Sequence, residues 1–414
     1  MSSTAVDRRV PILEDPAVPA SDVLGDGAVE VMAAFLSEVG ATVERSQAVQ
    51  TTYHPGRSLT VRHLVKVRWA DGSRTEESMV LSAGRKPPAG SFVLNDGRHD
   101  VVVWRVPHDP WLPGMAPALD PARVGPLLAE VGLEAPQVRT NLRAYRPGRR
   151  AVVEVAGNGM RAFLKVVRPK SAEALHRRHE LLAGHVPVPH SLGWSAEHGI
   201  VILQALPGRT LREALLARFG VPGPGALLKV LDDLPPVDVT DTPAADWRAH
   251  EFAGILGSVA PALAERVGAL ADALDPYEAR ASDEPIVAVH GDYYEAQLLV
   301  DGGSVRGLLD VDTFGAGRRV DDLSTMIGHL SVLAVGSPRR VTIERYASRL
   351  LDGFDRVVHP GLLRAAVAGV VLGLATGSFR VLEPAWEEHT ERRVRLAEEW
   401  LASADRVSAA APST

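Results

Sequence analysis

Cysteine is absent from all 414 residues of the sequence. This absence excludes a disulfide framework, a cysteine-ligated zinc site and a thiol nucleophile, and it agrees with a reducing, cytoplasmic environment. Aromatic residues are few, at 5% of the chain, and no excess of basic residues is present because the formal net charge is −6. We therefore expect no nucleic-acid partner.

Long apolar runs are scarce as well. The longest, residues 365–379, is interrupted by glycine and is shorter than the roughly 20 residues that a membrane-spanning helix needs. It predicts a buried helix instead, and we expect no membrane partner. Residues 1–20 also lack the apolar segment of a secretory signal. The sequence does not indicate an oligomeric state.

The apolar spacing predicts an α+β protein with a β-rich first half and a helical second half. A single core stops growing near ~250–300 residues, so several units are expected. A Pro-rich segment at 107–114 indicates a linker, and Thr242 followed by Pro243 indicates the start of a long helix. The expected division is a disordered arm 1–22, a cap module 23–115, a β-rich lobe 116–206, a helical lobe 207–404 and a disordered tail 405–414.

The motif Tyr-x-Pro-Gly-Arg occurs twice, at 53–57 and at 145–149. Each copy precedes alternating apolar residues, and we compare residues 64–67 after the first copy with residues 164–167 after the second. Pro-Gly turns before strands can recur by chance. The other explanation is a duplicated hairpin architecture.

Most of the chemical information lies in His290, Gly291 and Asp292, which are followed by Gln297 and Asp310. Phosphoryl transfer needs a carboxylate that accepts a hydroxyl proton, oxygen ligands for Mg²⁺ and a cation on the nucleotide phosphates. Protein kinases place the base Asp and a metal-binding Asn five residues apart, and Asp292 and Gln297 have this spacing. Gln supplies the same amide oxygen on a side chain that is one methylene longer.

Asp310 is expected to lie beside Gln297 because the chain reverses between them. Apolar residues 298–300 and 305–309 flank Asp-Gly-Gly at 301–303, which predicts a β-hairpin. The polar groups would then converge on one point. The simpler alternative is that they are loop and turn residues, since Asp and Gly are ordinary in hairpins.

This segment resembles the aminoglycoside-phosphotransferase, or kinase-like, family. The family pattern is His-Gly-Asp, an Asn five residues after the Asp, a metal Asp at a strand end, and then Gly and Asp-Leu. Gly317, Asp322 and Leu323 fall at the matching positions, and the resemblance covers roughly residues 138–400. Gln297 departs from the usual Asn. In this and in having an N-terminal module, the chain looks similar to actinobacterial maltokinase-like and glucosamine-kinase-like enzymes.

The resemblance implies a bilobal protein-kinase-like fold, with a β-rich N-lobe and a helical C-lobe, and assigns roles to the motif residues. Asp292 would be the catalytic base, and His290 would fix the catalytic loop. Gln297 and Asp310 would bind Mg²⁺. Asp322 would begin a helix, bond the backbone N–H groups there and brace the loop.

The nucleotide, ATP or GTP, is expected in the β-rich lobe. By the same resemblance, Lys165 would grip its phosphates, with Glu180 rather than Glu173 as its helix partner. Backbone groups of Gln204 to Leu206 would bond the adenine edge, and the hairpin around Arg146 to Arg150 would cover the phosphates, with Arg149 or Arg150 in place of a Gly-rich loop. A solvated strand lysine, an exposed helix face and exposed turn cations are the structural alternatives.

A small-molecule hydroxyl acceptor is implied, and a sugar or aminosugar is the favoured class. Tyr294, Glu295 and Asp312 lie close to the motif and are candidate acceptor contacts. Trp386 is another candidate, although an apolar helix anchor explains it as simply.

Two other functions stay open at this point. One is an antibiotic phosphotransferase acting on aminoglycosides or macrolides, and the other is a non-catalytic nucleotide-binding regulator. A P-loop enzyme is excluded because no Walker A motif is present, and protein-kinase activity is disfavoured because no activation-segment motif is present. Four nearby histidines, among them His179, lack the spacing of a metalloprotease zinc site.

Overall fold

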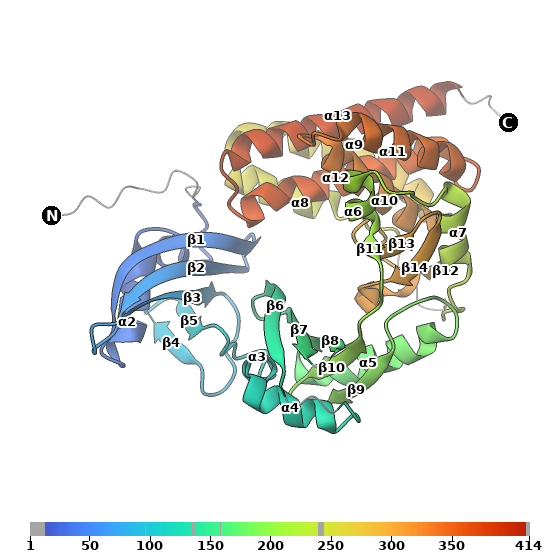
Figure 1. Cartoon of the computed structure of the whole chain (residues 1–414). Helices are drawn as coiled ribbons and strands as arrows, with labels where there is room; N and C mark the ends of the chain where they lie inside the picture. The colour runs from blue at the N-terminus through green and yellow to red at the C-terminus, as the bar shows by residue number, and fades with distance from the viewer. Residues whose placement is uncertain (1–12, 96, 134–136, 158, 239–243, 411–414) are drawn as a thin grey trace.

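The computed structural model describes residues 13–410 except for positions 96, 134–136, 158 and 239–243. It has three parts in chain order, namely the cap module, the β-rich lobe and the helical lobe (Figure 1). The predicted α+β architecture, with a helical lobe after a β-rich lobe, is confirmed. The helix start expected at Thr242 and Pro243 lies outside the described residues.

The cap module is one antiparallel sheet with the strand order β1-β2-β3-β5-β4 and helices on one face. In β2, every second residue from Leu59 to Val67 is buried, as expected for a strand with one face on the core, and all of them except His63 are apolar. Its elements are α1 (Ala20–Val23), α2 (Gly27–Ser37), β1 (Thr42–His54), β2 (Ser58–Arg68), β3 (Arg74–Ala83), β4 (Phe92–Asn95) and β5 (Asp100–Arg105).

The β-rich lobe contains a second antiparallel sheet with the strand order β6-β7-β8-β10-β9. Its elements are α3 (Met115–Leu119), α4 (Pro121–Ala129), β6 (Arg139–Arg146), β7 (Arg150–Gly157), β8 (Met160–Val166), α5 (Pro169–Ala183), β9 (Ser191–Ser195) and β10 (Ile200–Gln204). This order repeats that of the cap module, strand for strand, except that a helix, α5, is inserted after the third strand.

The two Tyr-x-Pro-Gly-Arg turns are held by the same hydrogen bonds. Asp15 accepts one bond from the Tyr53 hydroxyl and one from the Gly56 N–H, both at 2.8 Å. Asp109 accepts the equivalent bonds from the Tyr145 hydroxyl at 2.8 Å and from the Gly148 N–H at 2.6 Å. Both glycines have φ of +65°, a conformation that favours glycine.

The duplicated architecture therefore explains the repeated motif better than chance does. The strand register corrects one detail, because residues 64–67 lie in β2, which corresponds to β7 rather than to β8. Lys165 lies opposite Val152, and the equivalent pair in the cap module is Ser82 opposite Thr60. The lysine position is thus a buried serine in the cap module, bonded to Thr60 at 2.7 Å.

The helical lobe is built around α12, which packs against α8, α9, α10 and α13. Of the helices that the structure describes, α12 alone is long and apolar enough to span a membrane, and 67% of its apolar window is buried inside the fold, as the sequence led us to expect. The elements are β11 (Arg209–Thr210), α6 (Leu211–Ala217), α7 (Pro224–Asp232), α8 (Ala249–Val259), η1 (Pro261–Leu263), α9 (Ala264–Ala281), β12 (Ile286–Val289), β13 (Leu298–Asp301), β14 (Ser304–Leu308), η2 (Val311–Thr313), β15 (Gly315–Arg318), α10 (Arg319–Ala334), α11 (Arg340–Phe354), α12 (Pro360–Arg380) and α13 (Trp386–Ala410).

The cap module packs against both lobes. Its core continues into Ile255 and Val259 of α8 and into Phe379 of α12. On its other side, Trp104 of β5 belongs to the core of the β-rich lobe and donates a 2.9 Å hydrogen bond to the Tyr145 hydroxyl. The module therefore fixes the position of the second Tyr-x-Pro-Gly-Arg turn.

Both expected disordered ends are partly ordered. Leu13 and Val18 are buried in the core of the cap module, and Asp15 makes the bonds described above, so the described part of the arm, from residue 13, is folded. At the other end, α13 continues through residue 405 to Ala410 and buries Ala404. The proline and aspartate content of the arm suggested disorder, and composition alone does not reveal that Leu13 and Val18 pack into the core.

We predict that Asp109→Ala lowers the free energy of unfolding by about 2–3 kcal/mol, because it leaves buried donors on Tyr145 and Gly148 unpaired. Asp15→Ala is the matched control, since it removes the same bonds at a more exposed place where water can replace them, and about 1 kcal/mol is expected there. Urea unfolding of the full chain measures both. Equal losses of stability in the two variants would contradict the conclusion that Asp15 and Asp109 make equivalent bonds at sites of different burial.

Candidate active site

The motif residues lie where two hairpin-like strand pairs meet. The loop of residues 290–297 joins β12, which pairs with β15, to β13, which pairs with β14. Gly291 in this loop has φ of +79°, and a Cβ there would lie 2.7 Å from the Thr313 carbonyl oxygen. Only glycine fits this turn without displacing the backbone of residues 311–313.

His290 is a structural residue of this loop. Its Nε2–H donates to the Leu309 carbonyl at 2.9 Å, and its Nδ1 accepts from the Asp292 N–H at 3.3 Å. Burial lowers the pKa of His290, which agrees with this neutral form. The imidazole therefore ties the loop to the strand end that precedes Asp310.

Asp322 holds the same loop from helix α10. It lies fully buried in the first turn of α10, and its carboxylate accepts hydrogen bonds from the N–H groups of His290 at 2.7 Å and Gly291 at 2.8 Å. We expected it to bond N–H groups at the helix start, and this is wrong, because Asp321 bonds the Arg318 N–H there. Burial raises the pKa of Asp322 to about 7, opposed by the two loop hydrogen bonds.

Asp292 projects from the loop into the cleft between the lobes. Burial raises the pKa of its carboxyl to about 6, and the neighbouring Asp310 adds to the rise, whereas Arg150 and Arg146 oppose it. The Asp292 carboxylate also accepts a hydrogen bond from the Gln297 side chain. A carboxyl with a pKa near the working pH suits a general base.

Gln297 and Asp310 lie side by side. The backbone N–H of Leu309 donates to the backbone carbonyl of Gln297 at 2.8 Å. Asp310 is the next residue after Leu309, so it lies beside Gln297. The Gln297 amide nitrogen donates to the Tyr294 hydroxyl at 3.1 Å and to Asp292, which leaves its amide oxygen available. Burial would raise the pKa of Asp310, but Lys165 and Arg150 hold it below the usual value. The ionised carboxylate and the amide oxygen are hard oxygen donors, the chemistry that fits Mg²⁺.

Lys165 reaches this point from β8 with its side chain only 6% exposed. Its Nζ donates to Asp310 at 2.7 Å and makes a short hydrogen bond to Asp312. Arg150, at the end of the second Tyr-x-Pro-Gly-Arg turn, bonds the same two carboxylates at 2.8–3.1 Å. Arg150 is therefore paired, not a free turn cation.

The helix partner expected for Lys165 is wrong. Glu180 is 60% exposed and lies 3.3 Å from His176, and Glu173 pairs with Arg177. The buried polar residue of α5 is His179, whose Nδ1–H donates to the Pro189 carbonyl at 2.8 Å. Its Nε2 is buried without a partner. The spacing of residues in the sequence could not show whether Glu173 or Glu180 faces Lys165, because both lie on the same helix.

Two clefts meet at these groups. The Lys165 cleft, of about 540 Å³, is lined by Gln204 and Leu206 of the segment between the lobes and by Lys165, Gln297 and Asp310. The Asp292 cleft, of about 810 Å³, lies on the other side, with Asp292 and Asp312 in its wall. Tyr294 lines both clefts.

Two acceptor candidates do not reach either cleft. Glu295 is fully buried and paired with Arg212 at 2.7 Å, and burial raises its pKa. Trp386 is 2% exposed and packs on Phe379 in the core shared with the cap module. Both residues were proposed from proximity along the chain or from analogy, and packing explains them instead.

The sequence reasoning missed most of the Asp292 cleft. No motif links Arg178, Arg248 and Arg380 to the turn that carries Arg146 and Arg149, and only the fold brings them together in this cleft.

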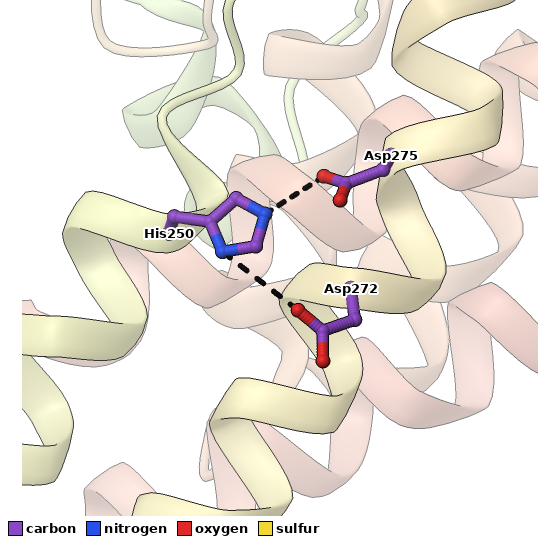
Figure 2. Close-up of side chains that lie close together, drawn as sticks. All are labelled: His250, Asp272 and Asp275. Carbon is purple, nitrogen blue, oxygen red and sulfur yellow. Dashed lines mark hydrogen bonds and ion pairs between the residues drawn. The ribbon is translucent and has the colours of Figure 1, made fainter.

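A separate cluster lies on the surface of the helical lobe, where His250 faces Asp272 and Asp275 (Figure 2). The His250 Nε2 lies 2.8 Å from Asp275 and its Nδ1 lies 4.0 Å from Asp272, with all three side chains over half exposed. Its hydrogen bond to Asp275 raises the pKa of His250. A solvated imidazolium between two carboxylates accounts for this geometry without a metal.

The model of the phosphotransferase enzyme family (APH) matches residues 141–357, just over half of the chain. No curated protein sequence matches the chain. Among solved structures, a thermostable mutant of aminoglycoside phosphotransferase APH(4)-Ia, in a ternary complex with AMP-PNP and hygromycin B, is similar at 16% identity and a TM-score of 0.43. That match covers 70% of this chain and 99% of the other.

Two further structures are similar at low identity. Macrolide 2'-phosphotransferase MphH from Brachybacterium faecium has 18% identity and a TM-score of 0.38, and the match covers 66% of this chain and 96% of that chain. The Plasmodium vivax ethanolamine kinase has 11% identity and a TM-score of 0.44, and the match covers 64% and 84%.

We predict that Asp322→Ala lowers the free energy of unfolding by about 2–3 kcal/mol, because two N–H groups of the loop lose a charged acceptor. Asp321→Ala, one position earlier on α10, removes the capping bond from the Arg318 N–H and a side-chain interaction with Trp247 but no bond to the loop, and it should cost less, about 1 kcal/mol. Thermal or urea unfolding distinguishes them. A larger loss for Asp321→Ala would mean that the loop does not depend on Asp322.

Proposed function

The chain belongs to the phosphotransferase enzyme family, and from this premise we propose that it transfers the γ-phosphate of ATP or GTP to a hydroxyl group of a small molecule. The observation that carries the proposal is the convergence of Asp292, Gln297, Asp310 and Lys165 at the junction of two clefts. Phosphoryl transfer depends on positioning and on charge stabilisation, and these four groups supply both.

Asp292 is the proposed base. The acceptor hydroxyl gives its proton to the Asp292 carboxylate as its oxygen forms a bond to the γ-phosphorus, while the bond between that phosphorus and the β–γ bridging oxygen breaks and the nucleoside diphosphate leaves. The hydrogen bond from Gln297 orients the carboxylate. His290 and Asp322 are positioning residues, since they act on the loop that carries Asp292.

Asp310 and Gln297 would hold Mg²⁺, which neutralises charge on the phosphates when it is bound. Lys165 and Arg150 keep Asp310 ionised, and their own positive charges suit them to hold the nucleotide phosphates. The nucleotide base would occupy the Lys165 cleft beside Gln204 and Leu206. His179, with its unpaired Nε2, lies in the wall of the same cleft and is an additional candidate contact.

A sugar-like acceptor is proposed for the Asp292 cleft. Its support is the resemblance of Gln297 and of the cap module to maltokinase-like enzymes, together with the stacked rings of Tyr294 and His329, 3.9 Å apart, in the cleft wall. Such a flat aromatic surface suits the face of a sugar ring. We propose a cytoplasmic location, in keeping with the absence of cysteine.

Replacing Asp292 with Asn is predicted to lower kcat by about 10²–10⁴, because the amide cannot accept the proton. Release of ADP in the presence of an accepted hydroxyl compound measures the loss, and binding of Mg²⁺-AMP-PNP should remain within about twofold. Full turnover by Asp292→Asn would show that another group is the base. A nucleotide that binds without any ADP release would favour a regulatory protein.

The pH profile offers a second test. Asp292 has a raised pKa of about 6 and must be ionised to act as a base, so the rate should fall about tenfold per pH unit below pH 6 and level off above it. Measuring kcat/KM from pH 4.5 to pH 8 gives the profile. A rate that stays constant down to pH 4.5 would contradict the assignment.

A further inference from the structure

We infer that the acceptor carries a negatively charged group, a phosphate or a carboxylate, in addition to the hydroxyl that is phosphorylated. The inference rests on the proposed function, because it names the chemical class of the acceptor. It is drawn from the charges that line the Asp292 cleft.

Cationic side chains dominate this cleft. Eight arginine and lysine residues line it, against two carboxylates, Asp292 and Asp312. The chain as a whole has a formal charge of −6, so this concentration of positive charge is local and opposite to the average. A concave site lined by one sign of charge attracts ligands of the other sign.

Four of these eight cations already have protein partners. Arg150 bonds Asp310 and Asp312, and Arg248 bonds Glu251 at 2.6 Å. Arg178 and Arg168 donate to backbone carbonyl groups. Lys170, at the start of α5, is exposed and adds positive charge to the cleft, but as a lysine it lacks the two-pronged geometry of a guanidinium group.

Arg146, Arg149 and Arg380 remain, and within the described part of the chain none of them has a carboxylate within 4 Å. All three guanidinium groups are accessible to solvent in the cleft. Partial burial lowers the pKa of Arg149, and the charges of Arg146 and Arg150 lower it further. Arg380 is affected in the same way, by burial first and then by Arg146. These like charges face one another, and an anion between them removes the repulsion.

The nucleotide does not account for this group of arginines. Arg146 and Arg150 line both clefts, so they lie at the junction where the transferred phosphate must pass. Arg149 and Arg380 line the Asp292 cleft and not the Lys165 cleft. They therefore lie on the acceptor side, where guanidinium groups suit bidentate bonding to a phosphate or carboxylate.

The cap module helps to build this side of the cleft. Arg85, after β3, donates to the Gly148 carbonyl at 3.1 Å and thereby holds the turn that carries Arg149. His54, at the end of β1, lies 3.9 Å from Glu251, the partner of Arg248. The same arrangement disfavours a polycationic acceptor such as an aminoglycoside, which these arginines would repel.

The experiment uses the full chain saturated with Mg²⁺-AMP-PNP, so that the nucleotide-side cations are already engaged. Glucose 6-phosphate, glucuronate, glucose, glucosamine and inorganic phosphate are titrated separately by calorimetry. We expect glucose 6-phosphate or glucuronate to bind at least about tenfold more tightly than glucose or glucosamine. The comparison of these two acids separates a phosphate-bearing from a carboxylate-bearing acceptor.

Arg380→Gln and, independently, Arg149→Gln should weaken binding of the preferred anion about tenfold. Arg345→Gln, an exposed arginine of α11 that lines neither cleft, is the matched control and should leave binding unchanged. Two variants are used so that a folding defect in one does not decide the result.

Three results would overturn the inference: tighter binding of glucose or glucosamine than of the anions, no anion binding to the loaded protein up to about 10 mM, or anion binding that only competes with AMP-PNP. A failure of the proposed function is distinguishable, because it appears either as a lack of Mg²⁺-AMP-PNP binding in the first step or as no release of ADP when Mg²⁺-ATP replaces the analogue in a parallel assay with the ligand that binds.

Discussion

The four-residue ion cluster of Lys165, Arg150, Asp310 and Asp312 is the interaction on which the rest of the structure depends. It joins the sheet of the β-rich lobe to the hairpin of the helical lobe, and it does so with largely buried charges that are costly unless they are paired. The cluster links the two lobes and keeps Asp310 ionised. The negative charge of Asp310 repels a negative charge on Asp292. The same cluster therefore also contributes to the raised pKa of the proposed base.

The cap module adds a second constraint, applied to the turn of residues 145–149. Asp109, Arg85 and Trp104 hold this turn from the linker and from the cap sheet. The module shares its architecture with the β-rich lobe, since both copies use an aspartate to hold a Tyr-x-Pro-Gly turn. The cap copy has Ser82 in place of Lys165, so it retains the fold of the sheet without the cation. We infer that it positions the arginine-rich turn over the cleft.

The sequence predicted the fold class, the buried α12 and the motif groups that meet at the cleft, because local spacing encodes hairpins and loop geometry. It could not predict that Asp312 rather than Glu180 pairs with Lys165, since a helix presents several acids and only packing selects among them. Arg248 and Arg380 were missed for a related reason, because their proximity arises entirely from tertiary contacts. For Trp386 the sequence left both an acceptor contact and an apolar helix anchor open, and packing in the core selects the anchor.

The central claim is that Gln297 and Asp310 share one divalent metal next to Asp292. A crystal structure of the complex with Mn²⁺ and AMP-PNP, with the metal located by anomalous scattering, tests it most directly. The account predicts one manganese bonded to the Gln297 amide oxygen and the Asp310 carboxylate, with Lys165 moved from Asp310 to the phosphates. A metal bound away from both residues, or Lys165 and Arg150 still bonded to Asp310 beside a bound nucleotide, would contradict it.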